Sequence, residues 1–168
     1  MDLSTYFLEL ATKLKEIAHN PERKRYIEVN GYDNMLGLIE PDNFIKDTIL
    51  IHDVAINGRF FAENSDQVLD RIPGMFYVLQ RADKTNLSAV KATHKATLLI
   101  GKKIISKMRR DQYLESIHQS TAGLRNLDVA SFTYQSVGPL VSGWHGTMFQ
   151  FSLVEKPGII YNAEDWIE

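Results

Sequence analysis

The sequence contains no cysteine. This absence excludes disulfides, metal sites built from thiolates and a cysteine nucleophile, so the chain must fold by packing alone. It also has no apolar run near the roughly 20 residues that span a bilayer, and its start, MDLSTYFLELATKLKEI, has no basic leader followed by an apolar block. We therefore expect a soluble protein, intracellular when it is made, with no membrane partner.

No repeat, low-complexity block or linker divides the chain. Its 168 residues, of which 44% are hydrophobic, are enough to cover one core. We therefore predict a single domain over residues 1–168. Residues 156–168 are acidic and aromatic, and we expect them to dock loosely or to extend as a tail.

Two segments carry apolar residues at helical spacing. The first begins the chain, where Asp2 or Ser4 can cap a helix, and its stripe is Leu3, Phe7, Leu10, Leu14 and Ile17. The second starts at Asn86 or Ser88, runs to about Tyr113, and its stripe is Leu87, Val90, His94, Leu98, Gly101, Ile105 and Met108. Because glycine costs about 1 kcal/mol of helix propensity, Gly101 suggests that another backbone comes close to this face.

Strand patterns occupy much of the remaining chain, at 25–29, 48–56, 59–63, 75–82, 130–137 and 147–155. The Asn57-Gly58 dipeptide favours a tight turn, which predicts a hairpin between the second and third of these strands. Residues 30–43 are predicted to form a polar loop, and Pro73-Gly74 to close another. This order indicates an α+β fold, a mostly antiparallel sheet with an N-terminal helix and one long helix packed on one face.

Charge is unevenly distributed, although the net charge is only −2. Residues 84–110 carry eight bases and no acid, whereas the segments before and after them each have an excess of five acids. Helical geometry places these cations on one flank, with Lys91, Lys95, Lys102 and Arg109, and on an outer side, with Lys103, Lys107 and Arg110.

Three interpretations of the basic helix stay open. Its cations can simply keep an exposed face solvated and complement the helix dipole. They can dock an acidic partner, including the acidic ends of another copy of this chain. They can also contact nucleic-acid phosphates, but that function favours interleaved aromatics or a basic protein, and the isoelectric point is about 6.2. An acidic partner therefore fits better than nucleic acid.

A serine and a histidine, Ser142 and His145, lie three residues apart beside Trp144. Nucleophilic catalysis would need a third group to orient the histidine and donors for an oxyanion, and the surrounding sequence supplies neither. The G-x-S-x-G pattern is also missing. We therefore interpret the stretch as a hairpin loop in which Trp144 packs over a sheet end, or as a contact loop in which Trp144 and His145 anchor an interface.

The other histidines show no zinc-binding spacing, and no carboxylates form an obvious acid and base pair. We predict a protein that is not an enzyme, with no metal and no cofactor. His94 lies among apolar residues, where a satisfied core histidine is commoner than a ligand or proton shuttle. A binding module with a pocket marked by His94 and Gly101 stays open as an alternative, as does a nucleic-acid-binding protein.

The order of elements resembles that of the small tail-terminator and neck (tail-completion) proteins of tailed bacteriophages and prophages. The resemblance covers residues 3–155 and is carried by the segments IPGMFYVLQRAD and FTYQSVGPLVSGWHGTMFQFSL. Within the latter, GWHGTMFQFSL is similar to the final strand of such proteins, in which a Gly-aromatic step precedes alternating apolar residues. The 30–43 loop and the C-terminal tail match no pattern of the family.

The resemblance implies a structural subunit that forms a homo-oligomeric ring, for example a hexamer, and has no catalytic residues. Such a ring caps the tail tube and joins it to the head-connector proteins, and DNA passes through it without sequence-specific binding. The implied location is the virion, with the host cytoplasm as the place of assembly. Edge strands and loops would add to the neighbour's sheet, and the contact residues would be Trp144, His145, Lys91, Lys95, Lys102 and Arg109.

Overall fold

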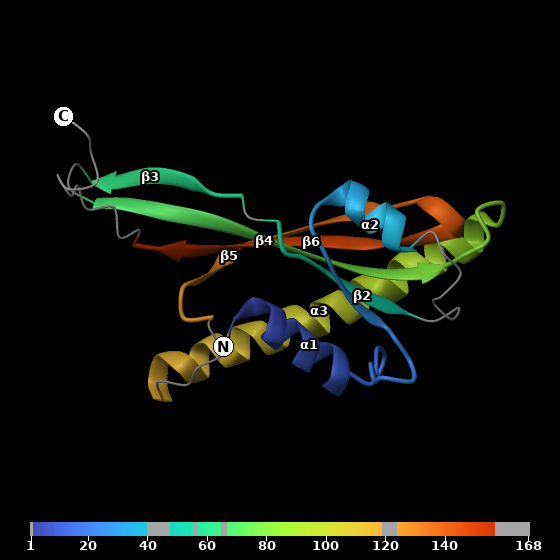
Figure 1. The fold of residues 1–168 in the computed structure, drawn as a ribbon, viewed down its shortest axis with the longest axis horizontal. Helices are drawn as coiled ribbons and strands as arrows, with labels where there is room; N and C mark the ends of the chain where they lie inside the picture. Colours follow the sequence, from blue (N-terminus) through green and yellow to red (C-terminus); the bar gives the residue numbers. More distant parts are fainter. Residues whose placement is uncertain (1, 40–47, 56, 65–66, 119–123, 157–168) are drawn as a thin grey trace, which may run out of the picture.

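The computed structural model describes residues 2–39, 48–55, 57–64, 67–118 and 124–156. Its elements confirm an α+β fold with a mostly antiparallel sheet (Figure 1). In chain order they are α1 (Leu3–Lys13), β1 (Tyr26–Val29), α2 (Tyr32–Ile39), β2 (Ile49–Asp53), β3 (Arg59–Asn64), β4 (Gln67–Arg81), α3 (Leu87–His118), β5 (Leu127–Val137), a short 3-10 turn (Val141–Gly143) and β6 (Trp144–Glu155).

The sheet is organised around β4, which pairs along one edge with β6. The strand order is β1-β2-β4-β6-β5, with β1 and β2 parallel and the other pairs antiparallel. On its other edge β4 pairs first with β3 and then with β2. The predicted hairpin between 48–56 and 59–63 is therefore wrong. These two strands follow one another along β4, and Asn57-Gly58 lies in the connection between them instead of in a reversing turn.

Pro73-Gly74, which was predicted to end a loop, lies in the middle of β4. Pro73 has no backbone N–H to give to a ladder, which normally excludes it from a central strand. It is tolerated here because it falls between Arg71, the last partner of β3, and Met75, the first partner of β2. Figure 1 shows the consequence, a long β4 whose first half runs with β3 as an arm away from the helices.

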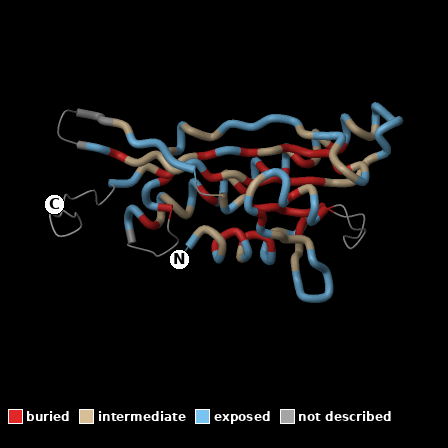
Figure 2. The backbone as a smooth tube through the Cα atoms, turned by 45° about the horizontal axis from the view of Figure 1, so that its top comes forward, coloured by how far each residue is buried: buried red, intermediate tan, exposed pale blue. Residues whose placement is uncertain are grey.

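The helices cover both faces of the sheet. The N-terminal helix α1 and the long helix α3 pack on one face, over a cluster that includes Leu50, Phe76 and Phe149. The short helix α2 packs on the opposite face, where its Met35 and Ile39 join a second cluster. Figure 2 shows that buried positions gather in the middle of the molecule, between these layers.

Helix α2 occupies the segment that was predicted as a loop over 30–43; residues 40–43 lie outside the described part of the chain. The prediction failed because Asn34 and Gly37 are weak helix formers and dominate the local composition. The helix depends on tertiary contacts instead. Met35 and Ile39, one turn apart, are both fully buried under it.

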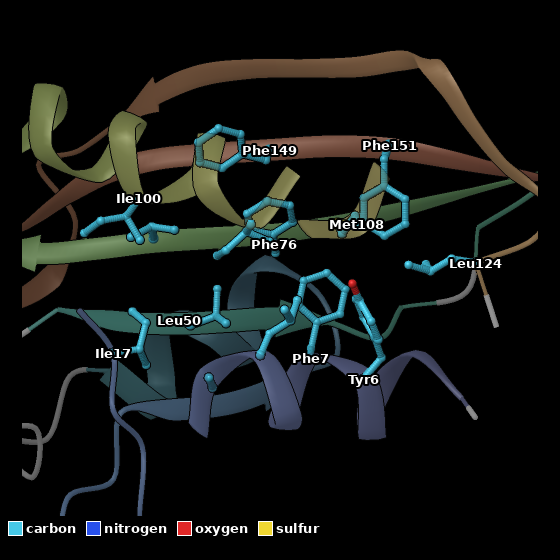
Figure 3. Close-up of a cluster of buried hydrophobic side chains, with 14 of the residues drawn as sticks. Tyr6, Phe7, Ile17, Leu50, Phe76, Ile100, Met108, Leu124, Phe149 and Phe151 are labelled. Carbon is cyan, nitrogen blue, oxygen red and sulfur yellow. The ribbon is translucent and has the colours of Figure 1, made fainter. Parts of the chain in front are cut away.

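Aromatic rings fill the space between the sheet and α3 (Figure 3). The rings of Phe76 and Phe149 stack with centroids 4.8 Å apart, and Phe7 of α1 lies 5.4 Å from Phe76. A Cβ atom on Gly101 would lie 1.9 Å from the Phe149 ring. The sequence suggested that a backbone approaches Gly101, whereas the approaching group is this aromatic side chain.

The buried face of α3 is rotated from the predicted one, because its centre includes threonines. Its buried members are Thr93, Thr97, Ile100, Gly101, Ile104, Met108 and Glu115. Leu87, placed on the core face by the sequence pattern, is 65% exposed. The hydroxyl of Thr97 lies 2.9 Å from that of Thr147 on β6 and donates to or accepts from it, so burying it leaves no polar atom unsatisfied.

The C-terminal part of α3 is tied to α1 and to the start of β5. The Tyr6 hydroxyl donates to an Asp111 carboxylate oxygen at 2.7 Å, and burial, together with this hydrogen bond, raises the pKa of Tyr6. Glu115, which is buried, accepts a hydrogen bond from the Leu124 backbone N–H. None of the helices in the described residues is long and apolar enough to cross a membrane.

We predict that Gly101→Ala destabilises the protein although alanine is the better helix former. The added methyl overlaps the Phe149 ring, and overpacking of this kind lowers the free energy of unfolding by about 1–3 kcal/mol. Gly37→Ala in α2 is the matched control, since a Cβ there meets nothing within 4 Å, and it should stabilise by about 0.5–1 kcal/mol. Urea unfolding of both variants checks this, and equal stabilities would contradict the packing described.

Candidate functional site

The cations of α3 divide into a paired and an unpaired set. Lys103 pairs with Glu16, and Lys107 with Asp111. The four cations of the predicted flank, Lys91, Lys95, Lys102 and Arg109, are all exposed, and none has a carboxylate partner among the described residues. The flank therefore carries positive charge that the described part of the fold does not use.

An open groove of about 610 Å³ runs between this flank and β5. Its charged lining is Lys102, Arg109 and Arg110, and its other lining residues are Ile105, Ser106, Gln112, Tyr113 and Val129. The Gln112 amide donates to the carbonyl of Leu127, the first residue of β5, at 2.7 Å, which fixes the helix wall to the strand wall. Tyr113 is 64% exposed and Val129 45% exposed, so the groove combines cations with accessible apolar surface.

The sequence did not single out Arg110, Tyr113 and Val129 as part of a site. Tyr113 could have been found, because it follows Arg109 by four residues and Lys102 by eleven and so continues the same helical stripe. Val129 could not, since only the tertiary packing of β5 beside α3 brings it to the groove.

Strand β5 is an edge of the sheet, and among the described residues it pairs only with β6. The segment from Val129 to Val137, VASFTYQSV, contains no charged residue and no proline, and most of it is exposed. Proteins usually protect an edge strand with charges, proline or a bulge, because its free N–H and C=O groups can pair with another chain. The register shifts between Asp128 and Thr133; beyond that irregularity, Thr133–Val137 pairs regularly with β6 and its outer edge is unprotected.

The arm formed by β3 and the first half of β4 is a second exposed feature. Phe60 on β3 is 59% exposed and Val68 on β4 is 49% exposed. The arm stays paired with β6 from Asp70 onward, and the Arg71 guanidinium lies 5.2 Å from the centre of the Phe61 ring and 3.7 Å from the Asp128 carboxylate. Within the described ranges its outer strand, β3, pairs only with β4, and the other edge of β3 has no strand beside it.

Trp144 was predicted on a loop, either packed over a sheet end or in contact with a partner. The structure places it in β6, fully buried. Its indole N–H donates to the Ile39 carbonyl at 3.3 Å, and the Arg81 guanidinium lies 5.1 Å from the ring centre. Trp144 thus fastens α2 to the sheet, and its burial removes it from the set of candidate contact residues.

His145 is also buried, with 2% of its surface exposed, so it too leaves the set of candidate contact residues. Neither of its ring nitrogens has a hydrogen-bond partner among the described residues. His94 lies beside it, at 5.9 Å between ring centres, and donates from Nδ1 to the Gly146 carbonyl at 2.8 Å. Burial lowers the pKa of His145, and a charge on His94 lowers it further.

Ser142 and His145 do not form a catalytic pair in the described structure. Ser142 is exposed while the His145 side chain is buried. No group of three His, Cys, Asp or Glu residues in the described part of the chain could hold a metal ion. The space beside Gly101, proposed as part of a ligand pocket with His94, is filled by the Phe149 ring. The groove and the β5 edge are therefore the features that best fit a functional site.

Comparison with models of protein families, with curated proteins and with solved structures found no match to this chain. The tail-terminator resemblance therefore stays a prediction from the sequence.

We predict that the protein loses stability as the pH falls below about 6.5, the usual histidine pKa. The unfolded state binds a proton in that range and the folded state resists it, because the pKa of His145 is lowered by burial. Stability is therefore full above this pH and declines as the pH falls toward the pKa of the folded state.

Urea unfolding of the native chain and of His145→Gln at about pH 7.5 and about pH 5.5 measures this loss. The variant should lose less stability between the two conditions, and a remaining loss is expected from His52, whose pKa is also lowered by burial. An identical loss in both proteins would show that His145 does not carry the effect.

Proposed function

We propose that this chain is a structural subunit that assembles with copies of itself into a ring. The observation that carries the proposal is the unprotected edge of β5 over Thr133–Val137, on the strand that also lines the unpaired basic groove at Val129. An exposed edge strand without charges or proline is a template for adding a strand from another chain. In a protein that does not use such an edge, selection against aggregation would favour its protection.

The two edges of the sheet differ, and this difference favours a closed ring. One edge is β5, and the other is made by β1 and β3. Pairing of unlike edges gives a head-to-tail contact, which generates a ring if the rotation between subunits closes and a filament if it does not. The arm of β3 and β4 extends from the sheet and can reach a neighbouring subunit.

Charge can set the register of this contact. The exposed flank of Lys91, Lys95, Lys102 and Arg109 faces away from the core, and the segments before and after the basic helix carry an excess of acids. Complementary charge across an interface selects the correct partner and orientation more than it adds affinity. The four cations of the flank are accordingly the contact residues of the proposal.

The resemblance to tail-terminator and neck proteins supplies the biological setting of the proposal. In that setting the ring ends the tail tube and joins it to the head connector, and DNA passes through its opening without sequence-specific contacts. The subunit assembles in the host cytoplasm and remains in the virion. In this role it performs no catalysis and needs no cofactor.

The experiment that tests the proposal adds charge to the β5 edge. Thr133→Lys combined with Gln135→Lys should lower the mass of the assembled protein, measured by light scattering across a concentration series, because lysines on an edge strand oppose strand addition. Both positions are exposed, so the free energy of unfolding should change by only about 0.5 kcal/mol.

Thr12→Lys combined with Ser88→Lys is the matched control, since it adds the same charge at exposed positions of α1 and α3. It should leave the assembled mass unchanged. An assembly that survives the β5 substitutions would contradict the proposed interface. Tight, salt-sensitive binding of DNA by the isolated subunit would favour a nucleic-acid-binding protein instead.

A further inference from the structure

We propose that the groove between α3 and β5 binds the acidic, aromatic C-terminal segment, residues 157–168, of a neighbouring copy of the chain. This inference rests on the proposed function, because it assumes that copies of the chain meet. The inference goes beyond the proposed function because it names the segment that occupies the groove and the charged residues that bind this segment.

Three acids near the start of the C-terminal third of the chain have partners among the described residues. Asp111 pairs with Lys107 and accepts from Tyr6, Glu115 accepts from a backbone N–H, and Asp128 lies 3.7 Å from the Arg71 guanidinium. The remaining acids of this third are Glu155, Glu164, Asp165 and Glu168. Three of these four belong to the last twelve residues, which contain no lysine or arginine.

Three of the cations left without a carboxylate among the described residues lie at the groove. Lys102, Arg109 and Arg110 line it, and no acid is among its lining residues. Cations gathered around one hollow repel one another, and an anionic occupant relieves that repulsion. Arginine binds carboxylates through two parallel hydrogen bonds, which makes Arg109 and Arg110 suited to an acidic peptide.

The apolar surface of the groove matches the rest of the segment. Ile105, Tyr113 and Val129 contribute this surface, and the segment contains Tyr161 and Trp166 among isoleucines. Aromatic side chains are the usual anchors of an interface, and they also stack on guanidinium groups. A hollow of about 610 Å³ is large enough for a few such side chains, so the groove would hold part of the segment.

Strand β6, which precedes the segment, ends beside the arm. Leu127, where β5 begins, is opposite Leu153, and β6 continues to Glu155 opposite Asp70 of the arm. The groove extends from Val129 back along α3 toward Lys102. We assign the groove to the segment of a neighbour because the proposed function brings copies of the chain together.

Charge reversal tests this contact in the full-length chain. Lys102→Glu with Arg109→Glu reverses the groove, and Glu164→Lys with Asp165→Lys reverses the segment. Each variant alone should assemble to a lower mass than the native chain in light scattering. An equimolar mixture should recover the native mass, because each groove then meets a segment of opposite charge on the other chain.

The matched control is Lys91→Glu with Lys95→Glu, which makes the same change of charge on the same flank but outside the groove. It should keep the assembled mass closer to native than the groove variant does. If the mixture stays at the low mass while a single chain with both reversals assembles, the segment binds its own groove and the proposal is overturned. Full assembly of both separate variants would overturn it as well.

A labelled peptide of residues 157–168 separates this inference from the proposed ring. Its fluorescence anisotropy should show binding to the native chain and to the Lys91→Glu, Lys95→Glu control. Binding to the Lys102→Glu, Arg109→Glu variant should be about tenfold weaker, as expected for two lost exposed charge pairs. A native chain that stays monomeric but binds the peptide in this way contradicts the ring and the contact between copies, while the groove's recognition of the segment stands. Equal binding by all three proteins contradicts the groove and leaves the ring untouched.

Discussion

The arrangement of this protein depends on one packing constraint, the ring of Phe149 pressed against Gly101. Because glycine has no side chain, α3 comes close enough to the sheet for Phe149 to stack on Phe76 and for Phe76 to reach Phe7 of α1. Gly74 admits the ring of Phe151 from β6 in the same way. The two glycines therefore fix how far the long helix lies from the strands.

That distance also determines the candidate site. With the threonine and isoleucine face of α3 buried, its cationic flank turns toward β5, and the hydrogen bond from Gln112 to Leu127 closes one side of the groove. Among the described residues the outer edge of β5 has no strand partner. The basic groove and this strand edge are the two features on which assembly is proposed to depend.

The sequence was sufficient where local pattern and tertiary packing agree. A first helix capped at Asp2 or Ser4, a strand over 147–155 and a cationic flank on the long helix were predicted, and the structure contains all three, with Asp2 as the cap. The sequence was insufficient to predict structure that depends on contacts between residues far apart in the chain. Helix α2 forms because its Met35 and Ile39 are covered by the sheet, β2 and β3 share β4 as a partner, and Trp144 is buried by Ile39 and Arg81. Val129 likewise lines the groove only because β5 packs beside α3.

The central claim is that the free strand edge and the groove make a closed contact between identical subunits. Electron microscopy of the native chain at high concentration tests it most directly. The account predicts rings with a central opening and one constant number of subunits, which dissociate as salt screens the charged contacts. Particles that never exceed the mass of a single 19.2 kDa chain, or open filaments of indefinite length, would contradict it.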